Sequence, residues 1–249
     1  MEISLTHKQG NFSIDASFQG AESGVTALFG PSGAGKTSVI NMVAGLMRPD
    51  TGRISINGLC LFDSALHIDL PPEKRRLGYV FQDGRLLPHL SVRSNLSYGM
   101  HRTPVSRRFV KFDQVVDLLG IDHLLQRRPA RLSGGEKQRV AIGRALLTSP
   151  AMLLMDEPLA SLDTARKDEV LPFIIRLGRE FAIPILYVSH ATDEIINLAT
   201  RLVMMENGRV LADGDLEDFL SRPDLRTRFG LDTERRCLPR TNDRIAWTE

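Results

Sequence analysis

The stretch formed by residues 132–163 constrains the fold of this chain more than any other part of the sequence. Its first part, Ser133-Gly134-Gly135-Glu136, stands immediately before apolar residues at helical spacing, which are Val140, Ile142, Ala145 and Leu146. This order places a hydroxyl and two unhindered backbone amides at a helix N-terminus, where free N–H groups and the positive end of the helix dipole favour an anion. A helix with an anion-binding start is therefore predicted here.

The second part of this stretch is a short apolar run, residues 151–155, that ends in Asp156 and Glu157. A continuous apolar run of this length is typical of a strand buried on both faces of a sheet. Such a strand delivers both carboxylates to the carboxyl edge of the sheet, where open α/β folds bind their ligands. The alternative is a polar turn, an ordinary helix and a core strand that happens to end in two acids. Either part alone leaves that alternative open.

A glycine-rich segment near the N-terminus predicts a phosphate-binding loop. Residues 25–29 indicate a strand, residues 37–46 indicate a helix, and between them lies Gly30-Pro31-Ser32-Gly33-Ala34-Gly35-Lys36-Thr37, followed by Ser38. This is the phosphate-loop pattern in the strand-then-helix context that it requires. Glycines allow the backbone to curl its N–H groups around phosphates without interference from a Cβ. We expect Lys36 to reach the β- and γ-phosphates and Thr37 to ligate Mg²⁺.

The rest of the chain supplies further elements and two single candidates. Strands are predicted at residues 2–6, 12–18, 53–58, 77–81 and 185–189, a hairpin at 202–205 and 209–211, and helices within 89–148 and over 170–181. In the last helix Pro172 is expected close to the first turns. Gln82 follows one strand and His190 follows another. A lone residue of either type carries little weight, although a neutral amide at such a strand end can ligate Mg²⁺ or hold a water.

Composition and charge exclude several classes of protein. The formal net charge is +2 and 25% of the residues are charged, so nothing general favours nucleic acid as a partner. Cys60 and Cys237 have the spacing of neither a disulfide framework nor a zinc site. No apolar run approaches the ~20 residues of a membrane span, and the N-terminus lacks the apolar core of a signal peptide. A cytosolic protein is expected, with any membrane role exerted through a partner.

Residues 12–218 resemble the ATP-binding subunit of an ABC importer. The resemblance rests on an ordered set of motifs, namely residues 30–37, Gln82, residues 132–136, Asp156-Glu157, residues 161–163 and His190. Residues 32–38, 69–83 and 141–147 are more similar to the molybdate branch than to the maltose or polyamine branches. The alternatives are an importer ATPase for sulfate, maltose or polyamines and a soluble mechanical ABC ATPase, which would normally carry a coiled-coil insertion or two tandem ATPase halves. A purely structural or sensing nucleotide-binding protein would need neither Glu157 nor His190.

The resemblance implies an α/β fold, with a P-loop NTPase core made of a parallel-sheet ATPase subdomain, an N-terminal antiparallel β subdomain and an inserted α-helical signature subdomain. It implies an ATPase domain over residues 1–222 with the helical subdomain at about 84–148, and leaves residues 223–249 as a C-terminal tail or the start of a truncated regulatory domain. Molybdate-type subunits usually continue into a β-rich, oxyanion-binding regulatory domain, and this sequence ends at Glu249, too early to hold one. Residues 226–249, with a single Trp247, predict no fold of their own.

The resemblance also implies which residues hold the nucleotide and its metal ion. ATP would lie on residues 30–38. Phe12 would stack on the adenine, although a plain core phenylalanine explains this position equally well. Mg²⁺ would be held by Thr37 and Gln82 and by Asp156, the last through water.

Chemical roles follow from the same resemblance. Glu157 would orient and deprotonate the attacking water, His190 would contact the γ-phosphate, and Lys36 would neutralise the charge that develops. The signature segment would act on the ATP of a second copy of the chain, and Asp163 would link the two sites. The signature residues in question are Ser133, Gly134, Gly135 and Glu136.

The implied partners are a second copy of the chain in a homodimer and integral membrane channel subunits that dock against residues near 84–101. A periplasmic or extracellular oxyanion-binding protein would take part indirectly, and no nucleic acid is expected. ATP hydrolysis would energise the uptake of an oxyanion, with molybdate as the first candidate, and the chain would be bound peripherally at the cytoplasmic face of the inner membrane.

Overall fold

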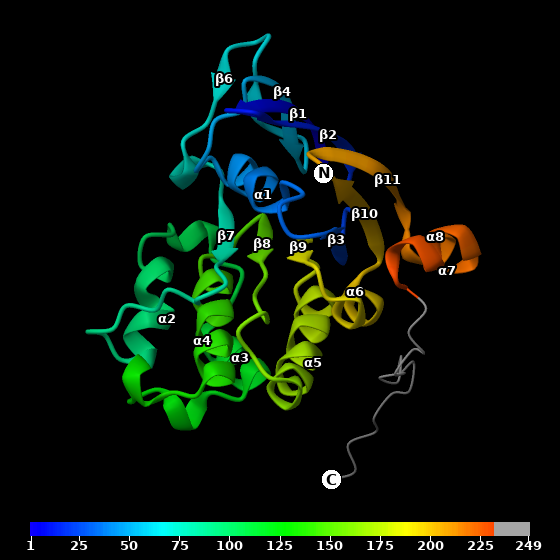
Figure 1. The fold of residues 1–249 in the computed structure, drawn as a ribbon. Coiled ribbons are helices and arrows are strands. Elements are labelled where there is room, and N and C mark those ends of the chain that lie inside the picture. The colour runs from blue at the N-terminus through cyan, green and yellow to red at the C-terminus, as the bar shows by residue number, and fades with distance from the viewer. Residues whose placement is uncertain (232–249) are drawn as a thin grey trace.

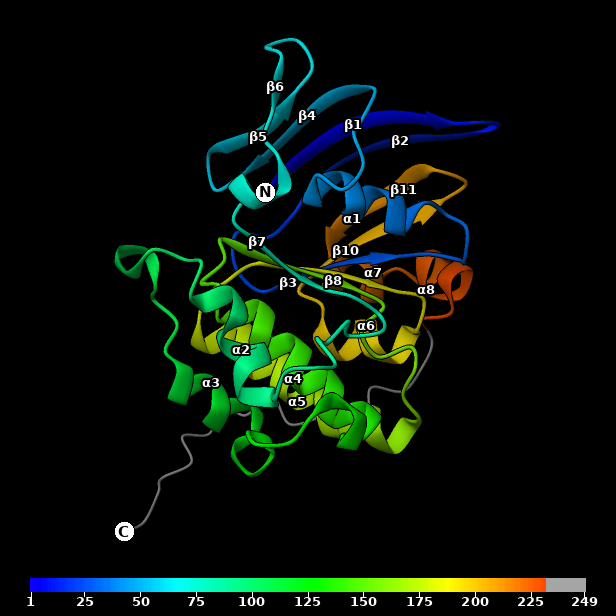
Figure 2. The ribbon, with the colours of Figure 1, turned by 90° about the vertical axis from the view of Figure 1, so that its left-hand side faces the viewer.

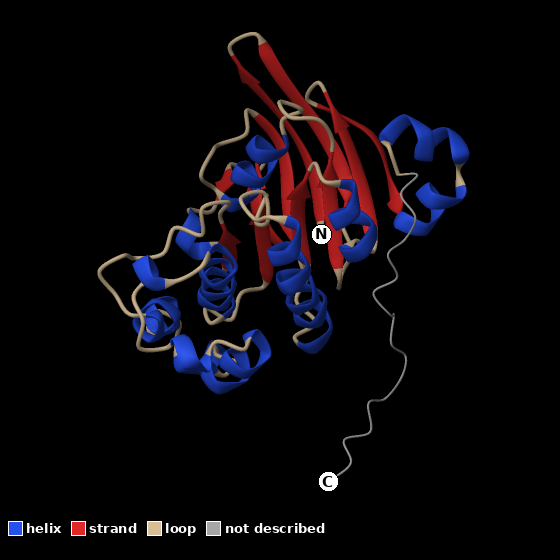
Figure 3. Cartoon of the chain, turned by 60° about the horizontal axis from the view of Figure 1, so that its bottom comes forward, coloured by secondary structure: helices blue, strands red, loops and turns tan. Residues whose placement is uncertain are grey.

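The strands form one mixed sheet that runs through the middle of the molecule (Figures 1 and 3). The structure is a computed structural model, and it describes residues 1–231. The order of the strands in the sheet is β6-β5-β4-β1-β2-β11-β10-β3-β9-β8-β7. The strands are β1 (Glu2–Gln9), β2 (Phe12–Gln19), β3 (Val25–Phe29), β4 (Thr51–Ile56), β5 (Leu59–Asp63), β6 (Ile68–Asp69), β7 (Leu77–Val80), β8 (Met152–Asp156), β9 (Ile185–Ser189), β10 (Arg201–Glu206) and β11 (Arg209–Asp215).

The sheet has a parallel half and an antiparallel half, as the sequence predicted. Strands β7, β8, β9, β3 and β10 pair in parallel. Strands β2, β1, β4, β5 and β6 pair antiparallel. The predicted hairpin around Asn207-Gly208 is confirmed by the antiparallel pairing of β10 and β11. The α/β fold class is therefore confirmed.

Helices cover both faces of the parallel half. The helices are α1 (Lys36–Ala44), α2 (Val92–Met100), α3 (Phe112–Leu119), α4 (Gly134–Leu146), α5 (Thr164–Glu180), α6 (Thr192–Leu198), α7 (Leu216–Ser221) and α8 (Pro223–Phe229). Figure 2 shows α1 on one side of the central strands, between them and the β1–β2 hairpin, and α4, α5 and α6 on the other side. The predicted helical stretch 89–148 thus contains three helices, and Gly120 ends α3 in a left-handed conformation.

Alternate residues of the central strands face two cores, because side chains along a strand alternate between its faces. In β3, Ala27 and Phe29 pack in the core that contains α4, α5 and α6, whereas Leu28 packs in the core that contains α1. In β8, Met155 belongs to the first core and Leu154 to the second. This two-sided burial explains why both strands are continuously apolar in sequence.

The helix predicted over residues 170–181 begins earlier than expected, at Thr164, so this prediction was wrong in its start. The carboxylate of Asp163 accepts a hydrogen bond from the Arg166 N–H at 3.0 Å and caps the new start. Pro172 therefore lies inside the helix and not in its first turns. A proline there leaves one carbonyl without its usual N–H donor, and the packing of Leu171 and Ile174 in the core holds the helix together across that gap.

The C-terminal part described by the structure adds α7, which packs beside β11, and α8, which packs against α7 (Figure 1). Helix α8 runs to Phe229 and so extends into the stretch 226–249, for which the sequence predicted no fold. Pro223 occupies the first position of α8, which suits a residue without a backbone N–H. The prediction for residues 232–249, including Trp247, falls outside the described residues. Across residues 1–231, none of the helices combines the length and the apolar character needed to cross a membrane.

Candidate functional site

The phosphate loop follows β3 at its carboxyl end, and α1 begins directly after the loop. Gly30, Gly33 and Gly35 have positive φ angles of 153°, 82° and 97°. Glycine adopts such angles at little cost, whereas a Cβ makes them unfavourable. A Cβ at Gly30 would also collide with the carbonyl oxygen of Met205. The glycines therefore permit a backbone path that other residues could not follow.

Lys36 is buried in the first turn of α1 and reaches back into the loop. Its side chain is 4% exposed, and its Nζ donates to the carbonyl oxygens of Gly30 at 2.7 Å and Pro31 at 2.8 Å. Burial lowers the pKa of the Lys36 amine, and the nearby carboxylates of Glu157 and Asp156 oppose that shift. The ammonium group is held inside the loop, in a position to form charge-assisted hydrogen bonds with an anion there.

Asp156, the last residue of β8, faces the first turn of α1. The Thr37 hydroxyl donates to Asp156 Oδ1 at 3.1 Å. Burial raises the pKa of Asp156, while the hydrogen bonds from Thr37 and Tyr79 lower it. Thr37 of the phosphate loop and Asp156 at the end of the apolar strand, which were predicted as separate motifs, are thus in direct contact.

Tyr79 belongs to this group although the sequence analysis did not single it out. Its hydroxyl donates to Asn41 Oδ1 at 2.9 Å and lies 3.3 Å from Asp156 Oδ2. Its ring stacks on Phe81 with centroids 4.1 Å apart, and burial raises the pKa of Tyr79, so the phenol keeps its proton. In the sequence, the only feature that could have drawn attention to Tyr79 is a phenol in the strand that leads to Gln82. Nothing local in the sequence identifies its two partners.

Glu157 and His190 are brought together from the ends of neighbouring strands. His190 Nδ1 lies 3.1 Å from Glu157 Oε1, with the histidine side chain 50% exposed and the glutamate 21% exposed. Glu157 has a φ of +45°, which is uncommon for a residue with a side chain. Its N–H donates to the Val188 carbonyl of β9 at 3.0 Å, and this bond helps to hold the unusual turn in place.

Gln82 and Phe12 make no polar contact with this cluster among residues 1–231. Gln82 is exposed and follows β7, whose last residue is Val80. Phe12, at the start of β2, is half-buried, and a Cβ added to Gly35 would lie 3.4 Å from its ring. The structure therefore places Phe12 against the phosphate loop. A stacking role for it stays a prediction, because the same ring also packs against the core that contains α1.

The signature segment is organised by contacts within itself. Ser133 Oγ accepts a hydrogen bond from the Glu136 N–H at 3.2 Å, and Glu136 Oε2 accepts one from the Ser133 N–H at 2.7 Å. The bond from Ser133 holds the pKa of Glu136 below its usual value. The predicted helix start is confirmed. In the described part of the chain, however, no hydrogen bond or ion pair joins Ser133 to the phosphate loop.

Asp163 lies beside the signature segment and not in the cluster around Asp156. It caps α5, as described above, and its carboxylate also lies 3.5 Å from Arg166 Nε. The turn that precedes it packs against the start of α4, since a Cβ at Gly134 would lie 2.9 Å from Leu162 Cδ2. The predicted residues therefore fall into two groups, one around the phosphate loop and one around Ser133.

Comparison with known proteins gives consistent relatives for this arrangement. A sequence model of a family described as ABC transporter matches residues 14–160. The molybdenum import ATP-binding protein ModC of Rhodospirillum rubrum is 65% identical over 225 residues, which are 90% of this chain and 60% of that protein. ModC of Paramagnetospirillum magneticum is 61% identical over 230 residues, 92% of this chain and 63% of that protein. The chain thus spans less than two thirds of the length of these two relatives.

The fold also has solved counterparts. The crystal structure of a nucleotide-free ATP-binding cassette from an ABC transporter superposes on this chain with a TM-score of 0.75 at 24% sequence identity. The superposition covers 94% of this chain and all of that one. At this identity the likeness concerns the fold.

Proposed function

The chain belongs to the ABC transporter family, and from that membership we propose that it hydrolyses ATP to energise the import of molybdate through a separate membrane channel. The observation that carries the ATPase part is the convergence of the buried Lys36 ammonium, the Thr37–Asp156 contact and the Glu157–His190 pair at one end of the sheet. The molybdate part is supported by the printed names of relatives that are up to 65% identical. The domain boundaries given above, 1–222 with a helical part at about 84–148, belong to the same proposal.

ATP binds on residues 30–38 in this proposal. The glycines let backbone N–H groups surround the phosphates, and the start of α1 adds its positive dipole end. Lys36 exchanges its bonds to the Gly30 and Pro31 carbonyls for bonds to the phosphates. Phe12, beside Gly35, is close enough to the loop to contact the base.

The oxygen atoms near the loop suit Mg²⁺. Thr37 Oγ1 and Asp156 Oδ1 are 3.1 Å apart, and Gln82 offers an exposed amide oxygen. Mg²⁺ prefers hard oxygen ligands and commonly takes only one or two from the protein, the others coming from phosphates and water. Within residues 1–231 no cluster of three His, Cys, Asp or Glu side chains forms a larger metal site. Thr37, Gln82 and Asp156 would hold the ion, which neutralises phosphate charge when bound.

Glu157 acts as the general base and His190 as its partner at the γ-phosphate. A carboxylate at this position can accept a proton from water as the water attacks phosphorus. The left-handed turn at Glu157 directs its side chain differently from that of Asp156, which separates the base from the metal ligand. His190 fixes Glu157 Oε1 at 3.1 Å.

A second copy of the chain completes the site. The signature segment begins a helix, whose dipole favours an anion at this end, and it makes no hydrogen bond with the phosphate loop of its own chain among the residues described. A twofold dimer would place this helix start against the ATP of the other copy, with Asp163 near the dimer axis. Two ATP molecules would then be enclosed between two copies.

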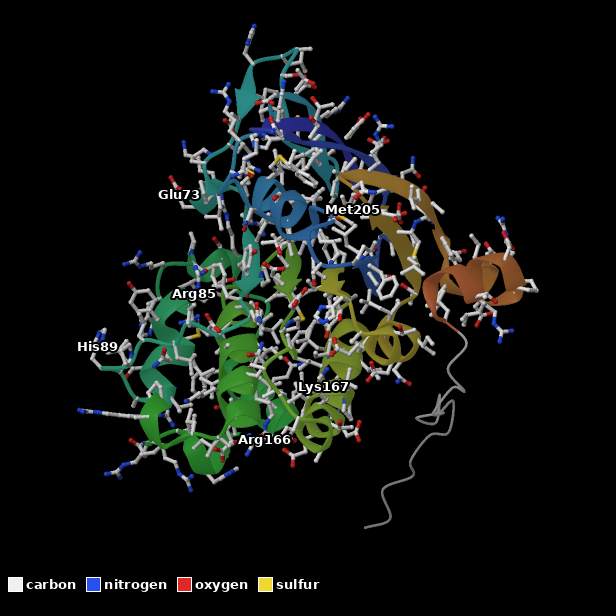
Figure 4. All side chains as sticks on the ribbon, in the orientation of Figure 1. Glu73, Arg85, His89, Arg166, Lys167 and Met205 are labelled. Carbon is white, nitrogen blue, oxygen red and sulfur yellow. The ribbon has the colours of Figure 1, made fainter. Side chains whose placement is uncertain are left out.

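The membrane channel docks near residues 84–101 in this proposal. Leu86, Leu87 and Leu90 are each half-buried, and Figure 4 shows His89 at the outer edge of the molecule in the same loop. The buried Asn95 side chain holds this loop by accepting from the Leu87 N–H at 2.8 Å and donating to the Leu87 carbonyl at 3.1 Å. An apolar surface kept in one shape suits a partner that covers it. The chain would thereby lie peripherally at the cytoplasmic face of the membrane.

Two experiments test the proposal at its two levels. The purified chain should turn over ATP. A folded protein that neither binds nor hydrolyses ATP would overturn the ATPase assignment. Deleting the gene should abolish molybdenum-enzyme activity in the cell, with recovery on excess molybdate. A deletion strain with normal molybdenum-enzyme activity at limiting molybdate would remove molybdate as the cargo and leave the ATPase assignment intact.

A further inference from the structure

Glu194 is a buried acid that none of the roles above uses. It lies in the first turn of α6 with 2% of its surface exposed. The Tyr187 hydroxyl and the Ser189 hydroxyl both donate to Glu194 Oε2 at 2.8 Å, and Lys167 Nζ lies 2.8 Å from Glu194 Oε1. A charge so far from water is tolerated only where its oxygens are well satisfied. Here both oxygens have partners.

One of these partners leads directly to His190. Ser189 is the last residue of β9, and its side chain is buried. While its hydroxyl donates to Glu194, the same oxygen accepts a hydrogen bond from the Ala191 N–H at 3.0 Å. This hydrogen bond therefore spans His190, because it joins the side chain of Ser189, the residue before His190, to the backbone of Ala191, the residue after it. A fixed Ser189 rotamer fixes the backbone from which the His190 ring extends.

A second partner leads to the start of α5. The Lys167 N–H bonds to the Asp163 carbonyl at 3.0 Å, so the lysine belongs to the turn that Asp163 caps. Figure 4 shows Lys167 next to Arg166 on α5. Through its two oxygens Glu194 thus connects the end of β9, which carries His190, with the helix start that carries Asp163.

Stability alone does not account for a charged group in this position. A buried ion pair is often no more stabilising than apolar residues of similar volume, whereas a fully satisfied polar network selects one arrangement of its members. The surrounding core is apolar and includes Ile195 and Val170. The network therefore contributes orientation, and the residue whose orientation it controls is His190.

We propose that Glu194 is a positioning residue for the hydrolysis step, which sets His190 through Ser189 and ties it to the start of α5 through Lys167. The inference rests on the proposed ATPase function. Since His190 Nδ1 lies 3.1 Å from Glu157 Oε1, the position of His190 also determines where Glu157 is held. Among the residues that the structure describes, Glu194 has no hydrogen bond or ion pair to the phosphate loop, so it acts on kcat and leaves the affinity for ATP nearly unchanged.

A double-mutant cycle on kcat tests this inference. Glu194→Gln keeps the shape of the side chain and removes its charge, and Ser189→Ala removes the hydroxyl that joins Glu194 to the Ala191 N–H. Each should lower kcat by about 2- to 100-fold, the range of couplings between residues in contact, with the KM for ATP nearly constant. In a His190→Ala background, Glu194→Gln should cause no further loss. Glu180→Gln, an exposed Glu-to-Gln change at the far end of α5, is the matched control and should have no effect.

The outcomes separate the inference from the function on which it rests. If wild type hydrolyses ATP and Glu194→Gln lowers kcat by the same factor with and without His190, the positioning role is overturned. If wild type does not hydrolyse ATP, the proposed function fails instead. When His190→Ala is too slow to measure, the NMR signals of the His190 ring decide. They should move in folded Glu194→Gln and Ser189→Ala while those of His7 on β1 stay in place, and unmoved His190 signals overturn the inference.

Discussion

The two groups of predicted residues are held in opposite ways. Around the phosphate loop, contacts join residues far apart in the chain, such as Thr37 with Asp156 and Glu157 with His190. Around Ser133 and Asp163, the hydrogen bonds that shape the site join residues three positions apart, in one capping box and one helix cap. The first group exists only because the whole sheet is assembled. The second is shaped by local hydrogen bonds, and Ser133 at its start is exposed, which suits a surface that acts on another molecule.

This difference predicts whether a substitution affects the isolated chain or only the dimer. A substitution in the first group should alter what one copy of the chain does alone. A substitution in the second should leave the isolated chain folded and able to bind ATP, and should act only when two copies close. The predictions below test this contrast, and one of them concerns a third region that belongs to neither group.

The largest effect is expected for Glu157→Gln. The amide keeps the shape of the carboxylate and can still contact His190, but it cannot accept a proton from water. Turnover of ATP should fall by about 10²- to 10⁴-fold, the range for a positioned general base, while ATP binding persists. Steady-state turnover and equilibrium binding of ATP measure the two quantities separately. A turnover within a few-fold of wild type would remove Glu157 from its proposed role.

Lys36→Ala should act on binding itself. The change deletes the buried ammonium that lies among the Gly30 and Pro31 carbonyls and would meet the phosphates. A hydrogen bond to a charged group contributes about 1.5–3 kcal/mol, so the affinity for ATP should fall by roughly 10- to 100-fold. Titration of the isolated chain with ATP provides the measurement, and Lys8→Ala on the exposed β1–β2 hairpin is a matched control. Unchanged affinity would contradict the placement of ATP on this loop.

Ser133→Arg should affect only the paired state. In a Glu157→Gln background, Ser133→Arg and Lys36→Ala homodimers each have two damaged sites. In the proposed dimer the Lys36 of one copy would face the Ser133 of the other, so in a mixed dimer both lesions would fall on one site and the second site would be intact. Mixing should recover trapped ATP that neither preparation holds alone. If closure requires both nucleotides, cross-linking through single cysteines placed at Ser32 and Ser133 still reports the arrangement. No recovery and no cross-link would contradict the head-to-tail dimer.

The contrast also explains which parts of the site could be predicted from the sequence. The phosphate loop and the helix start at Ser133 were predicted because each is a local pattern, with glycines before Lys36 and Thr37 in one and a serine and two glycines before apolar residues at helical spacing in the other. The strands that end at Asp156 and Ser189 were predicted because double burial makes them continuously apolar.

The parts that were missed depend on partners distant in sequence. Nothing near Tyr79 indicates that its hydroxyl lies between Asn41 and Asp156, and nothing near Glu194 indicates a partner on α5. The start of α5 was misplaced because Pro172 is a strong local signal for a helix beginning, whereas the Asp163 cap and core packing decide the actual start. At this position tertiary contacts override the local sequence preference.

Leu87→Glu sharpens the contrast in a third region, since its side chain belongs to neither group. The Asn95 contacts to Leu87 are to backbone atoms, so the exchange leaves them intact. ATP turnover by the isolated chain should stay within about two-fold of wild type, since surface substitutions away from specific contacts change stability little. Co-purification with the membrane channel should be lost. If turnover of the isolated chain collapses too, Leu87 is a core residue and the channel docks elsewhere.

The smallest expected effect is a pH dependence at the start of α4. The hydrogen bond from the Ser133 N–H holds the pKa of Glu136 below its usual value of 4.5. An acid whose pKa is lower in the folded state stabilises the fold above its unfolded pKa, and this contribution disappears as the pH falls through the folded value. Asp156 behaves oppositely, because burial raises its pKa and protonation relieves the cost of its charge. Acidification should therefore loosen the capping box and not the contacts around Asp156.

Hydrogen exchange of the first amides of α4 measures how strongly the capping box protects them, with Glu136→Gln as a control that keeps an acceptor but does not titrate. The difference in protection between wild type and Glu136→Gln should be about 0.3–1 kcal/mol near neutral pH, less at high salt, and should vanish as the pH falls below the Glu136 pKa. A difference independent of pH would mean that the Glu136 charge does not stabilise this helix start, and that the segment owes its shape to Ser133 alone.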